Sequence, residues 1–221
     1  MSQDSRRLRV VAIDHLMHYI EASIHCALIA RRVYPNTPTM TKKRFGVSVK
    51  LCASPGIRRY VKNFLTSLRP AIMCSRVQGI WVSITSQSEP SLSERFLIEF
   101  PNDFARSVIH GKFSSTDQTE LDVACTASQV LAKAYQGLES RLGVSNSPME
   151  GPKSWELLVD IREHQIGSDM IDLPVGCVQV EPVSEASYRN STGFCRLPLK
   201  SSSIDDKVVM LTCLDMKSPP I

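Results

Sequence analysis

Residues 8–33 of the chain read LRVVAIDHLMHYIEASIHCALIARRV, without an internal proline or glycine. Apolar residues recur there at intervals of three and four, which is typical of a helix with one apolar stripe. The stripe comprises Val10, Ile13, Met17, Ile20, Ile24, Ala27 and Leu28. Pro35 predicts that the helix ends by Tyr34, because proline disfavours helical geometry in the residue before it. So long a stripe predicts a central helix packed against a sheet.

Further helices and short strands follow this helix. Ser54 is a suitable N-cap and Pro55 a suitable first helical residue, so a second helix is predicted from there to about Pro70. The predicted strands are 45–51, 77–85, 95–100, 155–161 and 208–214, a third helix is predicted at 117–142, and 101–116 is predicted as loop. Segments 77–85 and 95–100 are joined by a short polar connection and predict an antiparallel hairpin. The layout predicts an α+β domain with three helices on one face of a mainly antiparallel sheet.

Residues 167–193 differ in character from the rest. They are rich in Pro, Ser, Gly and acidic residues, with short apolar pieces such as 173–175 and 177–180. A stretch of this length without regular structure is uncommon inside a compact domain, and it is usually functional or disordered. The embedded apolar residues, and the strand predicted after them, favour a function.

Composition excludes several classes of protein. A chain of 221 residues with 43% hydrophobic residues can bury a full core. Its seven cysteines are odd in number and form no C-x-x-C pair, which argues against a disulfide framework or a zinc site and favours a reducing compartment. We expect no secretory signal and no membrane insertion, since no apolar run approaches the ~20 residues that span a bilayer.

The charge is mildly basic, with 26 Lys and Arg against 22 Asp and Glu and a formal net charge of +4. The basic residues come in small groups at 31–32, 42–44 and 58–62. The plain interpretation is solvated surface. The more specific interpretation is a weakly basic surface patch that faces DNA or an acidic partner.

Catalytic signatures are absent from the sequence. It contains neither a Gly-rich phosphate loop nor a G-x-S-x-G elbow. Asp14, His18, Glu21 and His25 share one face of the first helix and could in principle hold a transition metal, but the polar side of an amphipathic helix explains them more simply. A Cys–His nucleophile pair has no local signature either. We therefore assign no catalytic, cofactor-binding or metal residues and expect no enzyme.

Six segments, in order, carry a resemblance to a known family. They are 31–35 (RRVYP), 43–49 (KRFGVSV), 54–61 (SPGIRRYV), 94–100 (ERFLIEF), 157–163 (LLVDIRE) and 196–200 (RLPLK). Together they resemble the HORMA-domain family, in particular the small accessory subunits of translesion DNA polymerase zeta. Other HORMA proteins, of the spindle checkpoint or the meiotic chromosome axis, match less well the V-Y-P helix end and the E-R-F strand.

The resemblance implies a domain plan. Residues 8–216 would form one HORMA domain, with a core at 8–163 and a safety belt and closing strand at 164–216, between a disordered tail at 1–7 and a tail at 217–221. In this family the belt wraps a partner peptide, which is held as an added strand of the sheet. Here 167–193 would be the belt and 208–214 the strand that latches it.

The resemblance also implies binding residues. The peptide would be a proline-containing segment of the catalytic subunit of polymerase zeta, held in a pocket lined by Tyr60, Val175 and Cys177. The family often has a large aromatic residue where Val175 stands, and Trp155 or Tyr188 would replace it, with Tyr34 and Phe64 as further lining. Leu197, Met210 and Thr212 would form a second surface, for a Y-family scaffold polymerase.

Further partners implied are an AAA+ remodelling ATPase and a second HORMA domain. Pairing of HORMA domains in the family depends on an arginine, and here Ala132 and Lys133 stand in that neighbourhood. The expected role is a non-catalytic nuclear adaptor in translesion synthesis and DNA damage tolerance, also found in the cytoplasm, with no cofactor and only weak or indirect contact with DNA. The alternatives are a checkpoint or meiotic-axis HORMA protein, a direct DNA binder and, last, an enzyme.

Overall fold

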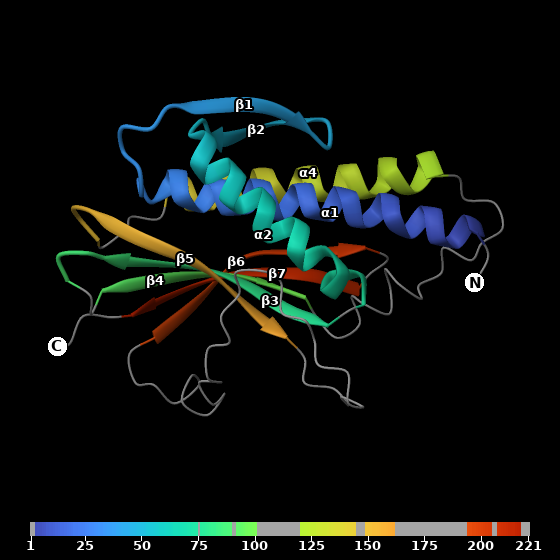
Figure 1. Cartoon of the computed structure of the whole chain (residues 1–221). Coiled ribbons are helices and arrows are strands. Elements are labelled where there is room, and N and C mark those ends of the chain that lie inside the picture. Colours follow the sequence, from blue (N-terminus) through green and yellow to red (C-terminus); the bar gives the residue numbers. More distant parts are fainter. Residues whose placement is uncertain are drawn as a thin grey trace.

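The computed structural model describes residues 3–74, 76–89, 92–100, 120–144, 149–161, 194–204 and 207–217. Three helices lie on one face of a five-stranded sheet, and a separate two-stranded hairpin lies on the other side of the helices (Figure 1). This arrangement confirms the predicted α+β class, with its three helices and antiparallel sheet. None of the described helices is both long and apolar enough to cross a membrane.

The large sheet has the strand order β5-β3-β4-β7-β6, and every neighbouring pair is antiparallel. The elements are α1 (Gln3–Ala30), β1 (Thr39–Arg44), β2 (Val47–Cys52), α2 (Pro55–Met73), β3 (Val77–Ser86), β4 (Ser93–Glu99), α4 (Glu120–Val144), β5 (Lys153–Ile161), β6 (Phe194–Ile204) and β7 (Lys207–Lys217). The predicted hairpin of 77–85 and 95–100 is present as β3 and β4. The chain leaves the sheet at one edge, β5, and re-enters it at the opposite edge, β6.

Helix α1 is the centre of the fold, as its apolar stripe predicted. It begins at Gln3, five residues before the predicted start, since no helix breaker precedes residue 8. Its middle is buried on nearly every side, and Tyr19, Ile20, Ile24 and His25 are all fully buried. The prediction of a polar side is therefore wrong at His25, because the β1–β2 hairpin covers the helix where water was expected.

The β1–β2 hairpin was only half predicted, because β1 reads TMTKKR and lacks the apolar alternation of a buried strand. Its two-residue turn, Phe45-Gly46, has positive φ at both positions (39° and 81°), which suits a tight hairpin but strains the phenylalanine. The Phe45 ring is held between Tyr19 and Tyr135, with centroid distances of 6.4 and 6.2 Å. This packing on α1 and α4 offsets the backbone strain.

Two further elements differ from the predictions: α2 extends beyond its predicted end, and no strand was predicted where β6 lies. Helix α2 continues through Pro70 to Met73, because Leu68 and Ile72 on either side of the proline are both buried in the core. Strand β6 includes 201–203, three serines that looked like a polar spacer, because pairing with β7 satisfies its backbone. The predicted loop at 101–116 and the proposed belt at 167–193 lie outside the described residues.

Candidate functional site

Three aromatic side chains from separate elements meet beside the outermost strand β5. Tyr60 of α2 lies edge-on against Trp155 of β5, with ring centroids 5.3 Å apart and an interplanar angle of 86°. Trp155 donates a hydrogen bond from Nε1 to Oη of Tyr34, at 2.7 Å. Tyr34 and Tyr60 remain 39% and 48% exposed. We call Tyr34, Tyr60 and Trp155 the aromatic cluster.

Strand β5 forms the edge of the sheet next to this cluster. Residues 153–161 pair with β3 on one side, and no other described strand lies on the other side. An edge strand offers a row of backbone N–H and C=O groups to which a further strand can add. The aromatic cluster and this edge together make a surface that suits an extended peptide with bulky side chains.

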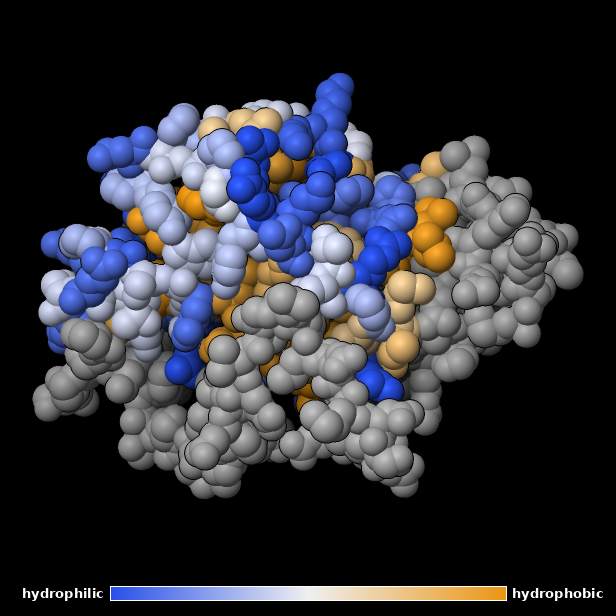
Figure 2. Space-filling view, viewed as in Figure 1, coloured by the Kyte–Doolittle hydropathy of each residue, from blue (hydrophilic) through white to orange (hydrophobic). Residues whose placement is uncertain are grey.

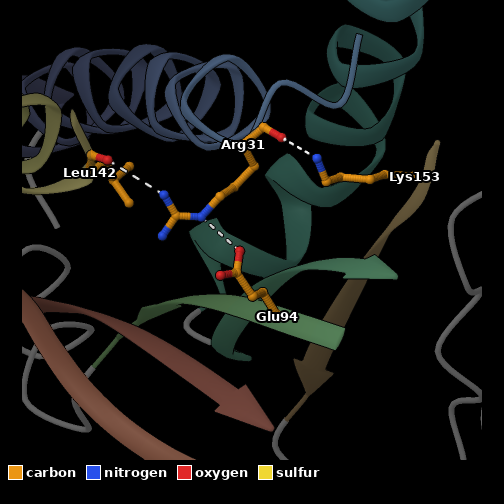
Figure 3. A network of polar contacts seen from close by, with 4 residues as sticks. All are labelled: Arg31, Glu94, Leu142 and Lys153. Atoms are coloured by element: carbon orange, nitrogen blue, oxygen red, sulfur yellow. Dashed lines mark hydrogen bonds and ion pairs between the residues drawn. The ribbon is translucent and has the colours of Figure 1, made fainter. Parts of the chain in front are cut away.

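A buried ion pair holds the elements that carry the cluster. Arg31, directly after α1, donates from Nε to Oε2 of Glu94 on β4 at 2.7 Å, and both side chains are fully buried. Its Nη1 donates to the carbonyl oxygen of Leu142 on α4 at 3.4 Å, and its guanidinium carbon lies 5.3 Å from the centroid of the Phe96 ring. Figure 3 shows Arg31 between Glu94 and Leu142, with Lys153 reaching the carbonyl oxygen of Arg31.

The same network ties the end of α1 to the start of β5. Nζ of Lys153 donates a hydrogen bond to the carbonyl oxygen of Arg31 at 3.0 Å. Tyr34 lies three residues after Arg31, and Trp155 lies two residues after Lys153, so the network fixes the relative positions of both rings. Interpreting Arg31 as part of a solvated basic group is wrong: Arg31 is buried, whereas its neighbour Arg32 is exposed.

The other predicted binding residues lie elsewhere. Phe64, one turn after Tyr60 on α2, is half-buried and packs against the core. Val175, Cys177 and Tyr188 lie outside the described residues. Leu197, Met210 and Thr212 lie on the neighbouring strands β6 and β7, where Thr212 pairs with Ile98 of β4 and with Lys200 of β6. Of the seven residues named for the peptide pocket, the structure thus brings together Tyr34, Tyr60 and Trp155.

The histidine and carboxylate face of α1 is divided among other partners. Asp14 pairs with Arg69, and Glu21 pairs with Arg44. His25 accepts a hydrogen bond at Nδ1 from the backbone N–H of Cys52 at 3.3 Å, and burial lowers the pKa of His25 to about 4. Among the described residues, no three His, Cys, Asp or Glu side chains are grouped to hold a metal ion.

Of the cysteines whose side chains the structure describes, the two buried ones, Cys26 and Cys52, are poor nucleophiles. Burial raises the pKa of Cys26 to about 12, and it also raises the pKa of Cys52. A catalytic cysteine requires the opposite shift, because the thiolate is the reactive form. Cys52 and His25 therefore do not form a nucleophile pair. Their contact is a hydrogen bond from the backbone N–H of Cys52 to the His25 ring, and it joins β2 to α1.

Known proteins are similar to this chain both in sequence and in structure. No protein-family model matches it. The mitotic spindle assembly checkpoint protein MAD2B of Gallus gallus is 29% identical over 97 residues, which cover 44% of this chain and 45% of that protein. MAD2B of Homo sapiens is 28% identical over the same length. The match thus spans less than half the length of these curated relatives.

Solved structures match nearly the whole chain. A chain of the crystal structure of the mitotic checkpoint complex has a TM-score of 0.65 and 13% identity, covering 94% of this chain and 99% of that one. The structure of HTP-2 of C. elegans bound to HTP-3 closure motif 1 has a TM-score of 0.59 and 9% identity, covering 91% of this chain and 84% of that one. At such low identity these likenesses establish the fold.

Proposed function

This chain has the fold of a HORMA-domain protein, and we propose that it is a non-catalytic adaptor that clamps a proline-containing peptide of the catalytic subunit of polymerase zeta. Through this clamp it links the polymerase to other factors in translesion DNA synthesis and DNA damage tolerance, in the nucleus. The observation that carries the proposal is the aromatic cluster beside the edge of β5 to which no described strand is paired.

The edge of β5 supplies the backbone part of the interaction. A peptide that adds to a sheet edge gains affinity from main-chain hydrogen bonds and specificity from pockets for alternate side chains. Residues 153–161 provide such an edge over nine residues. The peptide would run along β5, within reach of Trp155.

The aromatic cluster supplies the specificity for proline. Proline rings dock on aromatic surfaces, and proline-rich segments lose little entropy when they bind because they are already extended. Tyr60 and Tyr34 are half exposed although both are fixed by Trp155, so their rings are preorganised for a ligand. Phe64 would extend this surface one turn further along α2.

Retention of the peptide is assigned to the belt at residues 167–193. In sequence this belt stands between β5, at the edge where the peptide would add, and β6, at the opposite edge of the sheet. A segment that closes over the peptide slows its escape, and affinity then appears mainly as a small off-rate. In this proposal Val175 and Cys177 line the pocket from that segment, and β7 is the latch.

Three further partners are proposed. Leu197, Met210 and Thr212, on β6 and β7, are proposed to bind a Y-family scaffold polymerase. An AAA+ remodelling ATPase would open the belt. A second HORMA domain would pair through α4, near Ala132 and Lys133.

A second candidate function is that of a checkpoint or meiotic-axis HORMA protein. It is favoured by the structural likeness to the mitotic checkpoint complex and to HTP-2 bound to a closure motif. The two functions differ in the peptide that is clamped. Binding of a proline-containing polymerase peptide and of a checkpoint-type closure peptide, measured side by side, separates them.

The experiment that tests the proposal measures the off-rate of a labelled proline-containing polymerase peptide from the full chain. Tyr60→Ala should weaken binding, whereas Asn63→Ala, at an exposed position of the same helix, should leave it unchanged. Replacing the peptide's prolines by alanine should reduce the effect of Tyr60→Ala. Equal binding by all variants would reject the aromatic cluster as the peptide site.

Deletion of residues from about 200 onward tests retention. It removes β7 and the end of β6, and it leaves the residues of the aromatic cluster and of β5 in the chain. We expect a foldable core that binds the peptide with a much shorter lifetime, checked by circular dichroism and by the off-rate. An unchanged peptide lifetime in a folded truncation would contradict the clamp.

A further inference from the structure

Residues 22–88 contain no acidic residue. They hold eleven basic residues: Arg31, Arg32, Lys42, Lys43, Arg44, Lys50, Arg58, Arg59, Lys62, Arg69 and Arg76. The rest of the chain carries all 22 acidic residues and only 15 of the 26 basic ones. The chain's formal net charge of +4 therefore conceals a strongly basic segment joined to an acidic remainder.

The fold brings two parts of this segment together. They are the β1–β2 hairpin and helix α2, which contact each other through β2, whereas the rest of the segment lies in α1, in β3 and in the connections, and Arg31 is buried. On the outer face of the hairpin, exposed Lys43 and Lys50 stand among Thr39, Thr41 and Ser48, with Thr41 directly opposite Lys50. Helix α2 exposes Arg59, Lys62, Asn63 and Thr66. Figure 2 shows hydrophilic side chains gathered over the part of the molecule where these elements lie.

We define the basic surface as Lys43, Arg59 and Lys62. Ion pairs neutralise the charges where the basic segment meets the other helices: Lys50 Nζ lies 3.1 Å from Glu139 of α4, and Arg44 and Arg69 pair with residues of α1. Within the part of the chain that the structure describes, Lys43, Arg59 and Lys62 make no ion pair. Their charges point to an anionic partner.

The chemistry of the surface favours phosphate over protein carboxylate. Its exposed positions carry Lys, Arg, Ser, Thr and Asn, the side chains that most often contact nucleic-acid phosphates. A protein interface would have an apolar centre, and lysine is depleted there. The hairpin's only aromatic residue, Phe45, is buried in the core.

The exposed aromatic rings beside the basic surface belong to the aromatic cluster. Sites for single-stranded nucleic acid combine basic residues with exposed aromatic rings on which bases stack. Among the described residues of the hairpin and α2, Phe45 is buried, Phe64 packs against the core, and the exposed ring of Tyr60 is assigned to the peptide by the proposed function. With the peptide on these rings, the basic surface offers contacts to the phosphate backbone alone, and such contacts suit a double helix.

We propose that the basic surface binds the phosphate backbone of duplex DNA without reading its sequence. The choice of DNA over RNA rests on the proposed function, because a polymerase adaptor works at DNA. Binding would release condensed counterions and weaken with salt. A contact of this kind would hold the adaptor near the DNA while β5 holds the peptide.

Fluorescence anisotropy of a labelled random-sequence duplex of about 20 base pairs, titrated with the full chain at several salt concentrations, tests the proposal. We expect the affinity to fall steeply with salt, and Lys43→Glu with Arg59→Glu to weaken binding about tenfold and to flatten the salt dependence by about two phosphate contacts. The milder pair Lys43→Gln with Arg59→Gln should give an intermediate loss. This milder pair also tests the basic surface if the glutamate pair impairs folding.

The matched control is Lys133→Glu with Arg141→Glu, which changes the net charge equally at exposed positions of α4. An equal loss in this control would show attraction by net charge alone and overturn the basic surface. Tighter binding of single-stranded DNA, or of polyglutamate at equal charge, would overturn the proposal that duplex DNA is the ligand. Peptide off-rates are measured on the same preparations, so that failure of the DNA proposal can be told apart from failure of the peptide clamp. The charge variants leave the aromatic cluster intact and should not change these off-rates.

Discussion

Replacement of Arg31 by methionine should be among the most destabilising single changes in the chain. The side chain of Arg31 and that of its partner Glu94 are both fully buried, and Nε and Oε2 lie 2.7 Å apart. Arg31→Met would leave the Glu94 carboxylate in the core without its ion-pair partner. It would also remove the hydrogen bond to the Leu142 carbonyl.

The cost follows from desolvation. Breaking a buried ion pair by removing one partner costs about 3–5 kcal/mol, because the remaining charge loses its compensation. For a chain of this size, about 3–5 kcal/mol corresponds to a fall of roughly 6–20 °C in the unfolding midpoint. Replacing both partners, as in Arg31→Met with Glu94→Leu, removes the stranded charge, so the double variant should lie within about 1–2 kcal/mol of the wild type.

The assay is denaturant and thermal unfolding of the wild type, the two single variants and the double variant, read as a double-mutant cycle. Arg32→Met is the matched control, since Arg32 is adjacent but exposed, and it should change stability by less than about 0.5 kcal/mol. The coupling of the two charges would be refuted if the single variants lost no more unfolding free energy than the control. It would also be refuted if the double variant lost the sum of the two single losses.

Three further outcomes are expected. Tyr60→Ala should weaken peptide binding by more than about 1 kcal/mol, as truncation of an aromatic anchor does, and a smaller loss in a calorimetric titration would speak against its role. Tyr34→Phe removes the acceptor of the Trp155 hydrogen bond and should raise the peptide Kd about 2- to 10-fold, with unchanged affinity counting against preorganisation. The pKa of His25 is lowered from 6.5 to about 4, so its neutral form stabilises the fold above pH 6.5, and that stability is lost as the pH falls through about 4. The wild type should therefore lose roughly 2–3 kcal/mol more unfolding free energy than His25→Asn when the pH falls from about 7 to 4.5. Denaturant titrations that give both proteins the same pH dependence would contradict this.

Much of the architecture could be predicted from local patterns. The period of α1, the Ser54-Pro55 helix start and the alternation in β3 and β4 each follow from the nearest neighbours in sequence. Prediction failed where tertiary packing overrides local preference. Helix α2 passes through Pro70, and β1 forms without an apolar face, because the core and the neighbouring strand stabilise them.

The candidate site depends on contacts that no local pattern reveals. Tyr34 and Trp155 are 121 residues apart in sequence, and Arg31 and Glu94 are 63 apart. Tyr60, Tyr34 and Trp155 were named through a family resemblance, but their meeting in one cluster required the fold. Arg31 looked like its exposed neighbour Arg32, and only the acidic residue at the start of ERFLIEF could have indicated a partner.

The pairing of β4 with β7 has a consequence for how the chain is made. Strand β4 carries the apolar run FLI, and its partner begins more than a hundred residues later, at Lys207. Until residues 207–217 have left the ribosome, that side of β4 stays open to pairing with other chains, which is how exposed sheet edges aggregate. Contacts between segments so far apart also form slowly. Newly synthesised chains should therefore depend on chaperones most in the interval before β7 emerges.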